Sequence, residues 1–315
     1  MTNRISRLAP SPTGALHLGN ARTFLINWAL ARQRDWRLLM RIEDLDTPRI
    51  KAGAADQTLD ILCWLGLDYD GTPLRQSSDL APYRAALEAV VERRLAFACR
   101  LTRRDVERAA SAPHLGEHEL RCPPELRPAD PGAFRVGRAD ANYRFVTPDE
   151  TIEIADGFAG IRRFSPFDEV GDFVIWTRRD EPAYQLAVVV DDARQGVTDV
   201  VRGDDLLPSA ARQSLLYRAL GLVPPAWWHV PLILGPDGRR LAKRHGDTRI
   251  DHYRTAGAGP ERIVGLLAFW SGITPGREEM SADDFLRRFE LDRLGREAVI
   301  FTQEDDRWLR SGRQR

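Results

Sequence analysis

The chain has 315 residues, of which 46 are Lys or Arg and 46 are Asp or Glu, so its formal net charge is zero at pH 7. This balance excludes a global basic field, and any RNA-binding surface has to be a local patch. Three cysteines, Cys63, Cys99 and Cys122, are too few for a disulfide framework. No segment approaches the ~20 apolar residues that span a bilayer, and no signal-peptide pattern follows Met1, so we expect a cytoplasmic protein without a membrane partner.

Residues 7–20 form a turn rich in Pro and Gly between a predicted strand, Arg4 to Leu8, and a predicted helix. Apolar residues recur at helical spacing after Asn20, which is a good N-cap residue. Backbone N–H groups at a helix start carry a partial positive charge, and Gly14 and Gly19 would let a phosphate approach closely. The sequence therefore predicts an anion-binding turn.

Strand and helix signals alternate along the chain, which predicts an α/β fold with a doubly wound parallel sheet. Leu186 to Val190 is a continuous apolar run, as expected for a strand buried on both faces and closed by Asp191 and Asp192. The tail from Arg307 is expected to fray. The remaining predicted strands are 37–42, 143–146, 151–154, 173–176 and 229–234, and the remaining predicted helices are 54–65, 82–95, 208–220, 260–270 and 282–288.

A second candidate site is the cationic segment Arg239 to His245, which follows the turn Gly235-Pro-Asp-Gly238. Taken alone, a basic loop is usually solvated, and a Pro/Gly turn before a helix is common. The combination favours a site, because these segments are expected at the carboxyl ends of separate strands, where α/β sheets bind ligands.

These motifs resemble the class I aminoacyl-tRNA synthetases of the glutamyl and glutaminyl branch. His17-Leu-Gly-Asn20 stands where the family has His-Ile-Gly-His, and Arg240-Leu-Ala-Lys-Arg244 resembles the Lys-Met-Ser-Lys-Ser loop in its glutamyl form. Three further blocks are similar to this branch, namely Arg41–Arg49, Tyr184–Asp192 and Val201–Asp205. Five ordered blocks are not expected by chance.

The resemblance implies that this chain uses ATP with Mg²⁺ to activate an amino acid. Attack of a carboxylate on a phosphate brings two anions together, so catalysis depends on positioning and charge stabilisation. The family's two signatures close on the triphosphate, which assigns His17 and Lys243 as catalytic residues. The residues that the resemblance places at ATP are Pro12, His17, Gly19, Asn20 and Lys243.

The resemblance also implies a pocket for glutamate, with Arg7 at the side-chain carboxylate and Glu43 at the α-ammonium group. A guanidinium binds a carboxylate in bidentate fashion and suits a neutral amide poorly, so glutamate is favoured over glutamine. Each of these residues, taken separately, has the ordinary alternative of a surface ion pair or a packed core residue. The full glutamate set is Arg7, Ala9, Ser11, Glu43, Tyr184 and Arg202.

Only 71 residues follow Arg244 in the 315-residue chain, too few for the helical anticodon-binding region of a full glutamyl-tRNA synthetase. The resemblance is therefore to the truncated glutamyl-queuosine tRNA(Asp) synthetases, which attach glutamate to the queuosine base in the anticodon of tRNA(Asp). The expected partners are L-glutamate, ATP and queuosine-containing tRNA(Asp), with the protein a monomer. The alternatives are a glutamyl-tRNA synthetase acting on a tRNA 3′ end and a catalytically silent tRNA-binding paralogue.

The same resemblance divides the chain into four parts. Residues 1–96 are expected to form the first half of a Rossmann-type catalytic domain, and 97–141 an inserted subdomain. Residues 142–246 are expected to complete the catalytic domain with the lysine loop. Residues 247–315 are expected to form a short helical region, with no anticodon-binding domain.

Two positions depart from the family pattern. Family members commonly bind zinc in the insert through Cys-x-Cys, Tyr and Cys, whereas this chain offers Cys99, His118 and Cys122, with Leu101 in place of one thiolate. This degenerate set leaves zinc uncertain; the alternative is that Cys99 belongs to the core and Cys122 is a free surface thiol. Ala242 replaces the usual Ser of the lysine loop, which removes a hydroxyl near the phosphates.

Overall fold

The computed structural model describes residues 4–45, 50–101, 121–128, 141–239, 241 and 246–311. Its central strands are β1 (Ile5–Leu8), β2 (Arg37–Ile42) and β3 (Leu74–Arg75), which pair in parallel in that order. A second parallel pair joins β9 (Asp199–Gly203) to β10 (Ala226–Val230).

The two parallel groups meet at β1 and β9. The Thr198 N–H donates to the Ile5 carbonyl at 2.9 Å, which places β9 beside β1. The order β3-β2-β1-β9-β10 is that of a doubly wound Rossmann sheet, in which the strand order reverses between the first and fourth strands. Ligands of such sheets bind at the carboxyl ends of the strands beside this reversal.

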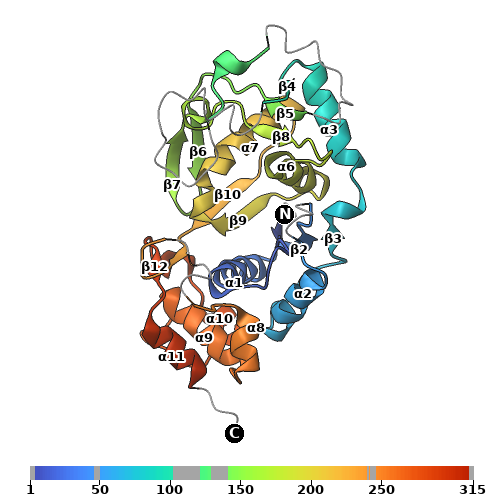
Figure 1. Cartoon of the computed structure of the whole chain (residues 1–315). Coiled ribbons are helices and arrows are strands. Elements are labelled where there is room, and N and C mark those ends of the chain that lie inside the picture. The colour runs from blue at the N-terminus through green and yellow to red at the C-terminus, as the bar shows by residue number, and fades with distance from the viewer. Residues whose placement is uncertain are drawn as a thin grey trace.

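The helix α1 (Leu18–Gln33) connects β1 to β2 and lies between the sheet and the C-terminal helices (Figure 1). Ten of its residues are buried, because it has neighbours on both sides. Arg22 is buried within it and donates to the carbonyls of Pro231 at 2.7 Å and Trp270 at 3.2 Å and to the Ser271 hydroxyl at 3.2 Å. These bonds connect α1 to both the sheet and the C-terminal region.

The upper part of the molecule in Figure 1 carries an antiparallel sheet of β4 (Ala96–Cys99), β5 (Asn142–Phe145) and β8 (Val174–Trp176). The β6 (Ile152–Asp156) and β7 (Gly160–Phe164) strands form a hairpin whose first strand also pairs with β10. The buried apolar side chains of these strands and of the helices beside them pack in one hydrophobic cluster. The helices of this part are α3 (Ala81–Glu92), α5 (Pro166–Glu169), α6 (Tyr184–Arg194) and α7 (Leu207–Leu220), whereas α2 (Ala54–Trp64) lies lower in Figure 1 and shares the hydrophobic core of α1.

The C-terminal region packs on α1, and its apolar side chains belong to the same core as those of α1, β1 and β2. A short strand, β12 (Val299–Ile300), pairs in parallel with β11 (Ile233–Leu234) and connects this region to the end of the sheet. No helix among the described residues combines the length and the apolar character needed to cross a membrane. The helices of this region are α8 (Ile250–Thr255), α9 (Pro260–Trp270), α10 (Ala282–Arg288) and α11 (Gln303–Arg310).

The prediction of a strand at Leu186–Val190 is wrong, because this run lies in α6. Every residue from Gln185 to Asp192 is buried, so a helix without a polar face gives the same apolar run as a central strand. Asp191 and Asp192 are therefore residues of this buried helix and do not end a strand.

Three predicted boundaries also differ from the structure. The first helix begins at Leu18 and its N-cap is His17, whose carbonyl accepts from the Ala21 N–H at 3.0 Å, so Asn20 is inside the helix. The predicted strand 229–234 is two strands interrupted at Pro231, which has no N–H to donate. The first part of the predicted tail, Arg307–Arg310, belongs to α11, which Thr302 and Asp305 start with a capping box, and residues 312–315 lie outside the described residues.

Candidate functional site

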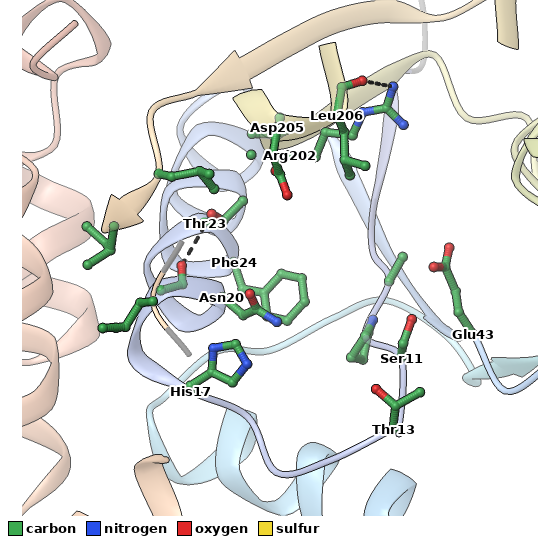
Figure 2. Close-up of a pocket in the computed structure, with 18 of the residues that line it drawn as sticks. Ser11, Thr13, His17, Asn20, Thr23, Phe24, Glu43, Arg202, Asp205 and Leu206 are labelled. Atoms are coloured by element: carbon green, nitrogen blue, oxygen red, sulfur yellow. Dashed lines mark hydrogen bonds between the residues drawn. The ribbon is translucent and has the colours of Figure 1, made fainter. Parts of the chain in front are cut away.

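A cavity of about 480 Å³ opens at the carboxyl ends of β1 and β9, where the strand order reverses. Figure 2 shows His17, Asn20, Thr23 and Phe24 along its α1 wall, with Ser11, Thr13 and Glu43 on the opposite side. Nine of the sequence-predicted residues line this one cavity, namely Arg7, Ala9, Ser11, His17, Gly19, Asn20, Glu43, Tyr184 and Arg202.

The wall formed by the start of α1 is held by backbone pairing with a distant segment. The Leu18 N–H donates to the Thr248 carbonyl at 3.1 Å, and the Ile250 N–H donates to the Leu16 carbonyl at 2.9 Å. His17 and Arg249 form an antiparallel bridge between these bonds. The segment that follows the predicted lysine loop is thus attached to the first turn of α1, and Gly19 in that turn lines the cavity.

A buried carboxylate holds two arginines at the floor of the site. Arg7 Nε donates to Asp192 Oδ1 at 3.1 Å, and Arg41 Nη1 donates to the same oxygen at 2.6 Å. Burial opposes ionisation of Asp192, but Arg41 and Arg7 outweigh it and keep the pKa of this carboxyl below its usual value. Arg7 is thereby fixed through Nε, with one long further bond from Nη1 to the Val201 carbonyl at 3.5 Å.

Glu43 lies beside this cluster and contributes the opposite charge to the cavity. Arg41 Nη2 donates to Glu43 Oε1 at 3.1 Å. Burial raises the pKa of Glu43, although Arg41 and Arg7 oppose the shift. The Glu43 carboxylate is therefore poorly solvated, and a ligand ammonium group would stabilise its charged form.

Arg202 is the second cation of the cavity and is held from three directions. Its Nε donates to His229 Nε2 at 2.9 Å, its Nη2 donates to the Leu206 carbonyl at 3.2 Å (Figure 2), and its guanidinium carbon lies 4.8 Å from the ring centroid of Trp227. Nη1 is buried and has no hydrogen-bond partner among the described residues. A buried donor without a partner is costly, so a ligand acceptor at this position would be stabilised.

The cavity thus combines two buried cations, the carboxylates of Glu43 and Asp205, and a helix start on a Rossmann sheet. A family model described as the catalytic domain of tRNA synthetases class I (E and Q) matches residues 5–308. The chain belongs to this family.

Similar proteins of this E/Q family agree with that assignment. The chain is 44% identical to a protein of Rhodopirellula baltica named glutamyl-Q tRNA(Asp) synthetase, over 100% of this chain and 96% of that one. It is 36% identical to a glutamate–tRNA ligase 2 of Halorhodospira halophila, over 98% of this chain and 66% of that one. A solved glutamate tRNA ligase of Elizabethkingia meningosepticum, in complex with its amino acid, matches with a TM-score of 0.80 and 26% identity, over 98% of this chain and 68% of that one.

Of the residues predicted from the E/Q motifs that the structure describes, Pro12 is not part of the cavity wall. Pro12 is buried beneath the loop, and its carbonyl accepts from the Lys51 N–H at 3.3 Å. Lys243 lies outside the described residues. Its neighbour Leu241 is described, lines the cavity and is anchored by a bond from its N–H to the Ile233 carbonyl at 3.1 Å.

Several residues that organise this E/Q synthetase site were not singled out from the sequence. The sequence analysis predicts Asp192 at the end of a strand, although Tyr184, Val188 and Asp192 recur at helical spacing, which is the signal that places Asp192 on the same helix face as Tyr184. His229 and Asp156 carry no local motif. Asp205, Thr13, Thr23 and Phe24 also line the cavity.

The predicted zinc set is only partly within the described residues, because His118 lies outside them. Cys99 is the last residue of β4 and is buried, as the alternative to zinc expects. Cys122 forms an isolated β-bridge with Gly171 and is fully buried, so the alternative of a surface thiol at Cys122 is wrong. Burial raises the pKa of the Cys122 thiol to about 11, which opposes the thiolate that zinc requires. No cluster of three or more His, Cys, Asp or Glu suited to a metal occurs in the described part of the chain.

Proposed function

We propose that this protein activates L-glutamate with ATP to form glutamyl-adenylate and transfers the glutamate to the queuosine base in the anticodon of tRNA(Asp). The observation that carries the proposal is the charge pattern of the cavity. Arg7 and Arg202 supply two cations and Glu43 supplies an anion beside Arg7, in one space at the reversal point of the sheet, and a second carboxylate, Asp205, lines the same cavity. L-Glutamate carries two carboxylates and one ammonium group, which match the charges of Arg7, Arg202 and Glu43.

The first half-reaction joins the two reactants held by this cavity. An oxygen of the α-carboxylate attacks the α-phosphate of ATP, the bond to the β-phosphate breaks, and pyrophosphate leaves with Mg²⁺ as the ion that accompanies ATP. His17 and Gly19 at the start of α1 would contact the nucleotide, and Lys243 would stabilise the charge on the phosphates. In this proposal Arg7 binds the side-chain carboxylate through the edge of its guanidinium that Asp192 does not occupy.

The second half-reaction consumes the adenylate. A nucleophile of the acceptor attacks the glutamyl carbonyl and AMP leaves, so the acceptor has to reach the open side of the cavity. The choice of queuosine rests on the 44% identity to relatives named for that activity over nearly their whole length. The charges of the cavity support the choice of the amino acid and carry no information on the acceptor.

A pair of assays tests the two halves separately. Purified protein is expected to exchange pyrophosphate into ATP with L-glutamate in the absence of tRNA, and a folded protein without exchange would favour a silent paralogue. Labelled glutamate is expected to reach tRNA(Asp) that contains queuosine, even when a chemical block closes the tRNA 3′ end. Equal labelling of unmodified tRNA(Glu) would refute the queuosine acceptor.

A second candidate is transfer to a tRNA 3′ end. It is favoured by the 36% identity to one glutamate–tRNA ligase and by the structural similarity to another, solved one. The blocked-end experiment separates the two, because a 3′ acceptor loses all labelling when its terminal ribose is blocked.

A further inference from the structure

Arg202 is held in the cavity by two buried polar residues, Asp156 and His229, that no motif of the sequence marks. Asp156, His229 and Arg202 follow one another from β6 through β10 to β9, and at most 7% of any of the three is exposed. His229 Nδ1 lies 2.6 Å from Asp156 Oδ2, and His229 Nε2 accepts from Arg202 Nε at 2.9 Å. This series of contacts ends at the cavity, where Arg202 Nη1 has no partner among the described residues.

The chemistry of the donors fixes the tautomer of His229. Arg202 Nε always carries a proton, so His229 Nε2 has to be an unprotonated acceptor. The ring proton is therefore on Nδ1, and it is donated to Asp156. Burial also lowers the pKa of His229 to about 4, so the ring is neutral at the pH of the cell interior.

Asp156 is itself fixed by backbone donors. Its Oδ1 accepts from the N–H groups of Phe158 at 2.9 Å and Ala159 at 2.7 Å, and both of its oxygens lie 3.2 Å from the His229 N–H. The two N–H groups require an acceptor at the Oδ1 position and thereby fix the plane of the Asp156 carboxylate. That orientation leaves Oδ2 for the imidazole.

We infer that Asp156 and His229 are positioning residues for glutamate recognition: they orient Arg202 so that Nη1 meets a carboxylate of the amino acid. The acceptor for Arg202 Nε is a neutral imidazole, which directs the guanidinium without cancelling its charge. An Asp or Glu in that place would form an ion pair and leave less positive charge for the substrate. This inference rests on the proposed activation of glutamate.

Trp227 completes the support from one side. Its ring lies under the Arg202 guanidinium carbon at 4.8 Å and stacks on His229 with 6.2 Å between ring centroids and an angle of 26° between planes. The arginine is thus confined by an aromatic face, an imidazole acceptor and the Leu206 carbonyl. Confinement of a long side chain before binding lowers the entropy that binding would otherwise lose.

A matched pair of substitutions tests the role of the imidazole. The side-chain amide of Gln in His229→Gln extends as far as Nε2 of the imidazole and can still accept from Arg202. The shorter amide of Asn in His229→Asn extends only as far as Nδ1, so it can donate to Asp156 but cannot accept from Arg202. The measurement is glutamate-dependent pyrophosphate exchange at saturating ATP. We expect His229→Asn to raise the KM for glutamate about ten- to a hundredfold with a smaller change in kcat, and His229→Gln to restore most of the affinity.

Asp156→Asn tests the tautomer. The backbone donors at positions 158 and 159 will hold the amide oxygen, so the amide N–H₂ faces His229 Nδ1 and drives the ring proton to Nε2. Two donors then face each other at Arg202, and the KM for glutamate is expected to rise although the substitution is nearly isosteric. Nitrogen NMR of the imidazole in the free protein reports the tautomer independently of activity, with Nδ1–H expected in the parent and Nε2–H in Asp156→Asn.

The outcomes separate this inference from the proposed function. A parent protein without glutamate-dependent exchange contradicts the proposed function, whereas the NMR result still confirms or contradicts the tautomer. Equal KM values in His229→Asn, His229→Gln and the parent would overturn the positioning role. So would a parent ring protonated at Nε2. Thermal unfolding of each variant shows whether a loss of activity reflects loss of the fold.

Discussion

Arg7 and Asp192 are 185 positions apart in the chain and form a buried ion pair, with Arg7 Nε 3.1 Å from Asp192 Oδ1. The same oxygen accepts from Arg41 at 2.6 Å. The Asp192 carboxylate therefore orients Arg7, which lines the cavity, and pairs with Arg41, which does not. The start of the sheet, at β1, is thereby connected to α6, the helix whose first residue is Tyr184. Glutamate selection then depends on a residue that need not touch glutamate.

Asp192→Asn should damage both stability and substrate selection. Removing the charge takes from buried Arg7 its carboxylate partner and leaves Arg41 with Glu43 at 3.1 Å and Asp191 at 3.8 Å, and breaking a buried pair in this way costs about 3 kcal/mol or more. We expect a lower free energy of unfolding in urea and a higher KM for glutamate. Asp68→Asn is the matched control, because Asp68 pairs with Arg32 at 2.9 Å on the surface and its loss should cost under about 1 kcal/mol. Equal losses in the two variants would contradict the role of burial.

His229 should make stability depend on pH. Its pKa of about 4 in the folded protein is below the ~6.5 of an unfolded His, so between these values the unfolded chain binds one more proton. The stability is therefore full above pH 6.5 and falls as the pH drops, by up to about 1.4 kcal/mol per unit. Burial is the main cause; Arg202 adds to it, and Asp156 and Asp205 oppose it.

The measurement is the free energy of unfolding of the parent and of His229→Gln from pH 7 to 4.5. The difference between the two curves isolates the contribution of His229, because the carboxylates titrate in both proteins. Parallel curves would show that the imidazole is not held neutral in the folded protein.

Gly19→Ala is expected to weaken ATP binding while the fold is kept. A Cβ at this position would meet only the Ile233 Cβ at 3.7 Å, which is an ordinary contact, and Ala stabilises a helix relative to Gly by up to about 1 kcal/mol. The methyl group would, however, occupy space in the cavity wall. We expect the KM for ATP in pyrophosphate exchange to rise with no loss of thermal stability. Gly14→Ala is the control, since its Cβ meets nothing within 4 Å and Gly14 does not line the cavity.

The sequence predicted the parts of the site that are carried by local motifs, and the structure brings nine of those residues to one cavity. It did not predict the supports of the site. A run such as Leu186–Val190 is apolar whether it is a buried strand or a buried helix. Because the run is predicted as a strand, Asp192 is predicted at the end of that strand and not beside Tyr184 on a helix. His229 and Asp156 acquire their roles only through the pairing of β6 with β10, a long-range contact that no local pattern encodes.

Arg22 should stabilise the docking of the C-terminal region on α1. Its three bonds to Pro231, Trp270 and Ser271 are buried, and burial lowers its pKa to about 10, so it remains charged at neutral pH. Arg22→Leu leaves buried carbonyls without donors and is expected to cost about 2 kcal/mol or more. Arg22→Lys retains a charge and one donor at the end of a flexible stem, so its loss should be intermediate. Urea unfolding of both variants provides the comparison.

Lys243 and Arg7 should differ in the kinetic constant that they change. Lys243 is proposed to act on charge that develops on the phosphates, so Lys243→Ala is expected to lower kcat for pyrophosphate exchange with a modest change in the KM for glutamate. Arg7 is proposed to bind the glutamate side chain before reaction, so Arg7→Ala should mainly raise that KM and reduce the preference for glutamate over glutamine. Because Arg7→Ala also takes one of two partners from Asp192, unfolding of the variant has to be measured in parallel. An unchanged kcat in Lys243→Ala would remove Lys243 from the mechanism, and a kcat effect shared by both variants would argue against separate sites for the two reactants.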